Sequence, residues 1–188
     1  MSMPLIISYH TPDPLYTAAA DRLRDSLKKF NLKYEVMCCP SRGSWLDNCN
    51  YKANFIYVML RSYARDILWL DADAEVVAYP ELFEQITEDV AAVIHREHEL
   101  LGSTIYFRNG MEAEKLCEAW VLANKAHPGQ WDQVNLKMVL NMEPYKDMVK
   151  FRALPHSYAQ IFDYQYETEL PPVIVQHQAS RQGRKVYP

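Results

Sequence analysis

The sequence predicts an α/β fold built around a mostly parallel central sheet. Strand-like apolar runs alternate with longer helical patterns along the chain, as in repeated strand–helix–strand units. The run Ile67–Leu70 is apolar at every position, which is typical of a strand covered on both faces. Asp71 and Asp73 follow it at once, and ligands of open α/β sheets bind beyond such strand ends.

The first strand is expected at residues 5–9, ahead of a helix. Asp13 suits the cap of that helix and Pro14 its first position, where a missing N–H removes no hydrogen bond. Apolar side chains at helical spacing give this helix a buried face, namely Ala19, Leu23, Leu27 and Phe30. A second strand is predicted at Tyr34–Cys38.

The polar stretch 40–50 is interpreted as a loop, and a mostly apolar helix is predicted over 52–63. Pro80 predicts the start of another helix that runs to Ile86. Further elements are expected as strands at 90–94, 104–107 and 173–175, and as helices at 113–121 and 132–141. The charged segment 95–99 separates the first two of these strands.

The length and the net charge narrow the possible functions. At 188 residues the chain is long enough for one domain with a full core, so a single domain is expected over 1–188. The net charge of −4 leaves no basic footprint, and no nucleic-acid partner is expected. A phosphate or an anionic sugar would have to be met by local Lys or Arg side chains or by a metal ion.

The N-terminal segment and the cysteines predict a cytoplasmic protein. Residues 1–7 lack the basic and long apolar regions of a signal peptide, and no run reaches the roughly 18 apolar residues of a membrane helix. The four cysteines show no paired CxxC spacing, so neither a zinc site nor a disulfide framework is indicated. Reduced thiols and no intrinsic membrane segment are therefore expected.

Asp71 and Asp73 stand one residue apart after the buried strand. Both carboxylates can reach one divalent cation there, and hard cations take carboxylate oxygens. The pattern predicts a metal ion together with an anionic ligand such as a phosphate. The alternative interpretation is that both are turn or cap residues, which are positions that Asp favours.

Separate motifs stand in a consistent order over residues 4–185. They are Lys52, Asp71-Ala72-Asp73 after its strand, Val76-Val77, Pro80-Glu81-Leu82-Phe83, the segment from Gly102 to Asn109, Trp131-Asp132-Gln133-Val134-Asn135, and His177 with Arg181 and Lys185 behind it. This ordered set resembles the small nucleotide-sugar-dependent glycosyltransferases of the GT-A fold, in particular the glycogenin-like members with a DxD motif. The segment 175–181 departs from the His-x-x-Gly-x-x-Lys-Pro pattern of that group.

The resemblance implies a fold, a reaction and a cofactor. The fold would be the Rossmann-like, three-layer sandwich of nucleotide-diphospho-sugar transferases. The reaction would be hexosyltransferase-like transfer from a UDP- or GDP-sugar to a hydroxyl acceptor, a glycan or a small molecule. Mn²⁺ or Mg²⁺ would neutralise the diphosphate leaving group. The Asp-Gln pair at 132–133 resembles that of retaining members, so retention of the anomeric configuration is expected.

The same resemblance implies roles for individual residues. Asp71, Asp73 and His177 would hold the metal, although His177 could equally be an ordinary hydrogen-bonded histidine. Asp132 would be the catalytic carboxylate, as a base for the acceptor hydroxyl or a ligand for sugar hydroxyls, and it could also cap a helix. The substrate-binding residues would be Tyr9, Thr11, Lys52, Asp71, Gly102, Ser103, Gln133 and Lys185.

Several of these binding residues have a second interpretation. Tyr9 could stack on a nucleotide base or simply pack, and Lys52 could contact a phosphate or the ribose or be a solvated helix-start lysine. Gly102 would let the backbone approach a sugar closely, or belong to an ordinary turn. Arg181 and Lys185 could clasp a diphosphate or belong to a charged terminus.

Two other functions share the motif after the strand. Phosphohydrolases of the haloacid-dehalogenase type also place DxD after an apolar strand and use the first Asp as nucleophile. Glu75 stands where those enzymes usually carry Thr or Val, and the motif lies in mid-chain, so both observations disfavour them. A non-catalytic domain that binds nucleotide-sugars is the other alternative.

Overall fold

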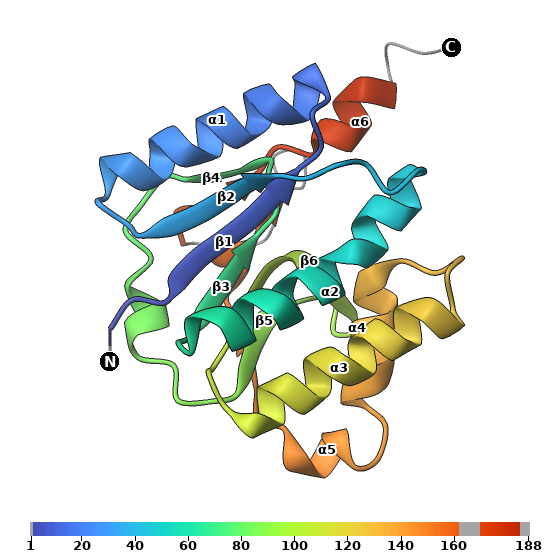
Figure 1. The fold of residues 1–188 in the computed structure, drawn as a ribbon. Helices are drawn as coiled ribbons and strands as arrows, with labels where there is room; N and C mark the ends of the chain where they lie inside the picture. The colour runs from blue at the N-terminus through green and yellow to red at the C-terminus, as the bar shows by residue number, and fades with distance from the viewer. Residues whose placement is uncertain (1, 162–169, 185–188) are drawn as a thin grey trace.

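A sheet of six strands forms the centre of the protein (Figure 1). The computed structural model describes residues 2–161 and 170–184. In sheet order the strands are β2 (Tyr34–Cys38), β1 (Leu5–His10), β3 (Ile67–Leu70), β6 (Glu99–Phe107), β5 (Val90–His95) and β7 (Phe151–Leu154). β1 is parallel to β2 and β3, and β5 to β7, whereas β6 is antiparallel to its neighbours β3 and β5. The predicted α/β class with a mostly parallel sheet is confirmed.

Successive residues of the central strands enter two separate cores, one on each face of the sheet. In β3 the odd-numbered residues pack with α2 (Trp45–Tyr63) and α3 (Met111–Ala126), and the even-numbered residues pack with α1 (Pro14–Lys29). A strand alternates its side chains between faces, so an apolar residue at every position marks a strand that is covered on both sides. The sheet is therefore the middle of three layers (Figure 1).

A second sheet of three strands packs on the face that α1 covers. Its order is β4 (Ala74–Val76), β9 (Ile174–Gln176) and β8 (Gln160–Ile161), with β4 and β9 antiparallel. β9 lies one residue later than the strand expected at 173–175, and the short strands β4 and β8 were not predicted. Because β4 follows Asp73 and β9 precedes His177, the His177 N–H donates to the Asp73 carbonyl at 3.1 Å.

The first helix begins where the sequence predicts. The Asp13 carboxylate accepts a hydrogen bond from the Leu15 N–H at 2.9 Å, and Pro14 occupies the first helical position. Leu23 and Leu27 are completely buried against the sheet. The expected buried face is confirmed.

The loop predicted over 40–50 is wrong, because α2 begins inside it at Trp45. Ser44 and Asp47 form a capping box there. The Ser44 hydroxyl accepts from the Asp47 N–H at 3.1 Å, and the Asp47 carboxylate accepts from the Ser44 N–H at 3.0 Å. The polar residues of this stretch thus satisfy helix N–H groups that would otherwise lack partners, although their composition resembles that of a loop.

Two further predictions needed correction. The helix expected over 80–86 is a single 3₁₀ turn, η1 (Glu81–Glu84), and the buried Ile86 lies beyond its end. The strand expected at 104–107 begins earlier, at Glu99, and forms a hairpin with β5. The charged residues between the two strands supply its turn, where Arg96 and Glu97 take left-handed backbone angles of φ 47° and 65°.

The remaining elements are α4 (Asp132–Leu140), α5 (Tyr145–Met148), the 3₁₀ helix η2 (His156–Tyr158) and α6 (Ala179–Arg184). β7 was missed because it lies at the edge of the sheet and buries only its last residue. All four cysteines are free thiols. Within residues 2–161 and 170–184, no helix combines the length and the apolar character needed to cross a membrane.

Candidate active site

A cavity of about 410 Å³ opens at the edge of the sheet where β1 and β3 end and where β6 begins to pair with β3. This is the carboxyl edge, where open α/β sheets bind their ligands. The predicted site residues that line it are Tyr9, Thr11, Lys52, Asp71, Asp73, Gly102, Ser103, Asp132 and Gln133. The structure thus gathers residues from five separate parts of the chain. Lys185 lies outside the described residues.

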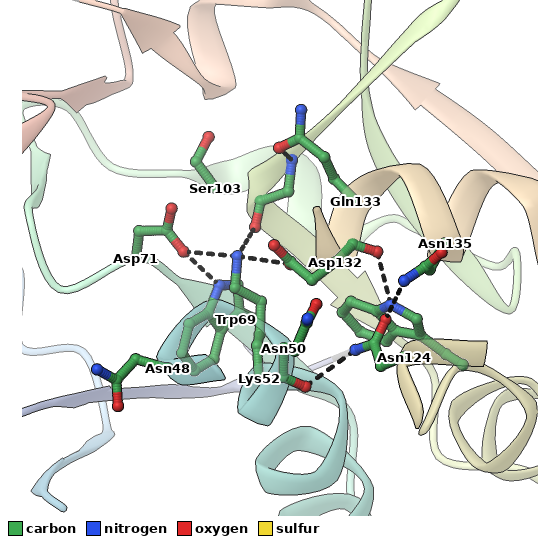
Figure 2. Close-up of polar contacts among 12 residues, drawn as sticks. Asn48, Asn50, Lys52, Trp69, Asp71, Ser103, Asn124, Asp132, Gln133 and Asn135 are labelled. Atoms are coloured by element: carbon green, nitrogen blue, oxygen red, sulfur yellow. Dashed lines mark hydrogen bonds and ion pairs between the residues drawn. The ribbon is translucent and has the colours of Figure 1, made fainter. Parts of the chain in front are cut away.

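The Lys52 ammonium group is the centre of the polar contacts in this cavity (Figure 2). Its Nζ lies 3.1 Å from Asp71 Oδ1 and 3.0 Å from Asp132 Oδ2, and it donates to the Gly102 carbonyl at 3.0 Å. Lys52 is only 6% exposed, which rules out its interpretation as a solvated helix-start lysine. One cation therefore joins the exit of β3 and the first half of β6 to the start of α4.

Electrostatics keep this lysine charged. Burial by itself lowers the pKa of Lys52, but the carboxylates of Asp132 and Asp71 more than offset it and raise that pKa above the ordinary lysine value. Burial raises the pKa of Asp132, and the Lys52 charge opposes this rise. Lys52 and Asp132 form a buried ion pair, and Asp71, whose side chain is 32% exposed, completes this ionic cluster at the cavity surface.

Asp71 is held in place by its own strand and by the neighbouring one. The Trp69 indole N–H donates to Asp71 Oδ1 at 2.8 Å, and the Asp71 N–H donates to the Ser103 carbonyl at 3.0 Å. Trp69 was not predicted to belong to the site. The signal for it was the period of two along a strand, which puts residues 69 and 71 on the same face.

Asp132 is positioned by a network that connects three helices. The Trp120 indole N–H of α3 donates to the Asp132 carbonyl at 2.7 Å, and Asn135 of α4 donates to the Asn124 side chain at 2.9 Å. Asn124 in turn donates to the Asn50 carbonyl of α2 at 2.9 Å (Figure 2). Asp132 does not cap α4, because it is the first residue of that helix and its carboxylate turns toward Lys52.

Tyr9 forms a wall of the cavity and is also firmly packed. Its hydroxyl donates to the Asn48 carbonyl, and its ring centroid lies 5.4, 5.0 and 5.5 Å from those of Tyr51, Phe55 and Trp69. These contacts establish the packing role that the sequence left open. The side of the ring that faces the cavity remains accessible to a ligand.

Asp73 and His177 lie side by side in the backbone, but their side chains face different groups. The Asp73 carboxylate accepts from the Ala179 N–H at 2.6 Å, whereas His177 Nε2 lies 2.8 Å from Glu75 Oε2. Asp73 lines the cavity, and His177 is not among the described residues that do so. Burial, followed by repulsion from Asp71, raises the pKa of Asp73 to about 6.

No protein-family model matches the sequence, and no curated protein matches it at a significant level. A solved structure does resemble it: the crystal structure of a glycosyltransferase involved in the glycosylation of the major capsid of PBCV-1. The two structures align with a TM-score of 0.71 over 98% of each chain. The fold is that of a glycosyltransferase. Because sequence identity is 10%, the likeness establishes the fold and leaves the reaction to the site itself.

Asp71 and Asp73, one residue apart after β3, are two of the carboxylates that line the cavity and could hold a metal. Both line the cavity, and their mutual repulsion is one cause of the raised pKa of Asp73. A divalent cation would relieve that repulsion, so the pair fits a hard cation that completes its shell with phosphate oxygens and water. In the described part of the chain, no group of three or more His, Cys, Asp and Glu side chains is arranged to hold a metal.

Gly102 leaves no room for a larger residue at the centre of the cavity. An added Cβ would lie 3.1 Å from Gln133 Cβ, 3.2 Å from Gln133 Oε1 and 3.4 Å from Lys52 Nζ. Its N–H also donates to Gln133 Oε1 at 3.2 Å. The close backbone approach that the sequence suggested is thus an approach to Gln133 and Lys52.

We expect Gly102→Ala to lower activity by about tenfold while the protein remains folded, because even a displacement of a few tenths of an ångström in groups that position a substrate is costly. Gln133 and Lys52 must move to admit the methyl group. Steady-state rates and thermal melting of the purified variant measure both effects. Gly129→Ala is the matched control, since a Cβ there meets nothing within 4 Å. Equal activity of the two variants would show that this close contact is unimportant.

Proposed function

We propose that the protein is a metal-dependent glycosyltransferase that moves a sugar from a UDP- or GDP-sugar to a hydroxyl acceptor. One observation carries the proposal: Lys52 joins Asp71 and Asp132, and Asp73 lines the same cavity, in a protein with a glycosyltransferase fold. A sugar-nucleotide needs both a means to neutralise its diphosphate and a placed carboxylate beside its sugar. This cavity contains residues suited to both tasks.

Asp71 and Asp73 are the proposed metal ligands, for Mn²⁺ or Mg²⁺. When bound, such an ion would act as a Lewis acid that neutralises the charge of the departing diphosphate. The chain's own cations take part nearby: Lys52 fixes Asp71, and Arg181 of α6 also lines the cavity. Thr11 at the exit of β1 and the accessible side of Tyr9 are proposed to contact the nucleotide.

Asp132 is the proposed catalytic carboxylate. The Lys52 charge stabilises the ionised form of Asp132, whereas burial raises its pKa. An ionised carboxylate of raised pKa is suited to accept a proton or to bind a sugar hydroxyl. Gln133 is fixed by the Gly102 N–H and presents its amide at the same wall. The Asp-Gln pair is the basis for proposing a retaining reaction and a glycogenin-like subgroup.

The proposal predicts that donor turnover requires Asp73. Purified protein with Mn²⁺ should release nucleotide from at least one UDP- or GDP-sugar, and the donor should raise the melting temperature more with Mn²⁺ than without it. Asp73→Asn should reduce turnover by at least about 100-fold, as expected when a group that neutralises transition-state charge is lost. The asparagine keeps an oxygen to accept the Ala179 N–H, so the fold is preserved.

Asp25→Asn is the control, because that exposed carboxylate pairs with Lys28 on the surface of α1. If no sugar-nucleotide in the panel shifts the melting temperature or is turned over, the proposed function is wrong. Phosphate release from a generic phosphate ester would instead favour the phosphohydrolase alternative. Nucleotide-sugar binding without turnover would indicate a non-catalytic binding domain.

A further inference from the structure

The four tryptophans of the chain fall into two groups. Trp69 and Trp120 are 2% and 0% exposed, whereas Trp45 and Trp131 are 41% and 52% exposed. Both exposed tryptophans line the cavity. Single exposed apolar residues are common on protein surfaces, but adjacent large ones mark a binding surface.

The two exposed rings lie together at the cavity. Their centroids are 6.3 Å apart and their planes meet at 83°, an edge-to-face arrangement. Trp45 is the first residue of α2, and Trp131 directly precedes α4. The starts of two helices far apart in the sequence therefore place a rigid aromatic corner beside the cavity.

This corner adjoins the proposed catalytic carboxylate. Trp131 is bonded directly to Asp132, whose carboxylate is held by Lys52 on the cavity wall. The proposed diphosphate and metal groups, Asp71 and Asp73, come from the exit of β3 instead. A ring stacked on Trp131 would thus stand on the Asp132 side of the cavity.

We propose that Trp45 and Trp131 form a platform that binds a sugar ring of the acceptor, a refinement that rests on the proposed function. One face of a pyranose presents several C–H groups and is apolar, and it matches the negative face of an indole. The hydroxyl groups at the edge of the ring remain free to reach polar groups such as Asp132 and Gln133. The acceptor is accordingly a saccharide or glycoside.

The charge around the platform favours a neutral sugar. Two cations, Lys52 and Arg181, line the cavity, and Lys52 is paired with Asp132. The carboxylates outnumber them, because Asp71, Asp73, Asp132 and Glu99 all line it. An anionic sugar would meet like charge there without the metal that serves the diphosphate. Neutral hexoses and pentoses are the expected class.

The test uses saturation-transfer difference NMR on the full chain. The probes are methyl glycosides of neutral hexoses and pentoses, a methyl glucuronide as the anionic comparison, and UDP and GDP with Mn²⁺. Trp131→Ala should weaken binding of the neutral glycosides by about tenfold or more, the size that aromatic stacking contributes in other ligands. Trp131→Phe should restore most of that binding, because it keeps an aromatic face, and nucleotide affinity should stay unchanged in both variants.

Tyr79→Ala removes another exposed aromatic side chain, 43% exposed and outside the cavity lining, and should change nothing. If nucleotide binds to the protein but no neutral-glycoside binding depends on Trp131, the platform is wrong while the proposed function stands. Loss of nucleotide affinity in Trp131→Ala would also overturn the acceptor platform, and it would indicate that the Trp131 indole binds the nucleotide base. Preferred binding of the glucuronide would overturn the assignment of a neutral acceptor. If neither UDP nor GDP binds the unmodified chain, the proposed function fails first and the acceptor assignment fails with it.

Discussion

Lys52→Met is expected to lower the free energy of unfolding by about 3–5 kcal/mol, the usual cost of removing one partner of a buried ionic group. Lys52 is 6% exposed and lies 3.1 and 3.0 Å from the carboxylates of Asp71 and Asp132. Without the lysine, the buried Asp132 carboxylate loses the cation that lies 3.0 Å away and is left beside the Asp71 carboxylate. For a chain of this size the melting temperature should fall by roughly 10 °C.

Urea unfolding of the variant measures this cost, and Lys28→Met is the matched control. Lys28 and Asp25 form an ion pair at 2.9 Å with side chains that are 61% and 75% exposed, and such surface pairs contribute little. A further variant that combines Lys52→Met with Asp71→Asn and Asp132→Asn should recover part of the loss, because it removes the uncompensated charges. Equal stability of Lys52→Met and Lys28→Met would show that the ionic cluster does not stabilise the fold.

The deficit of Lys52→Met should also depend on pH in a defined direction. Burial raises the pKa of Asp132, and the variant loses the Lys52 charge that opposes this rise. A carboxyl group whose folded pKa lies above its unfolded value binds more protons in the folded state, so stability falls as pH rises. Unfolding at pH 5 and pH 8 should therefore show the smaller deficit at pH 5.

Asp132→Asn is expected to reduce sugar transfer by about 10²–10⁴-fold, the usual contribution of a positioned acid or base. The amide cannot accept a proton, and it removes the negative charge that faces Lys52. Lys52 still pairs with Asp71, and the Asp132 carbonyl that accepts from Trp120 is unchanged, so the fold should be kept. Turnover with a donor identified by thermal shift measures the loss.

Donor binding provides the internal control for this variant. Because the proposed metal and diphosphate contacts lie at Asp71 and Asp73, the melting-temperature shift caused by donor and Mn²⁺ should match that of the unmodified protein. Asp147→Asn, a substitution in α5 away from the cavity lining, should leave turnover unchanged. Wild-type turnover in Asp132→Asn would exclude Asp132 as the catalytic carboxylate.

Some predictions that depended on local patterns were confirmed, whereas others were wrong. The Asp13 cap and the buried strand Ile67–Leu70 are visible in a few neighbouring residues, so the sequence reveals them. The capping box at Ser44 is also local, but its polar residues were interpreted as a loop. β4 and β8 span only three and two residues, too few for a periodic signal.

In the candidate site, too, some features are visible in contiguous residues and others depend on contacts between distant parts of the chain. The sequence by itself determined the fold class and the acidic exit of β3 at Asp71 and Asp73, because hydrophobic period and strand ends are properties of contiguous residues. Only the tertiary structure decided which carboxylates Lys52 binds, that His177 faces Glu75, and that the two exposed tryptophans meet at the cavity. These contacts join residues far apart in the chain, and their geometry depends on how helices pack against the sheet.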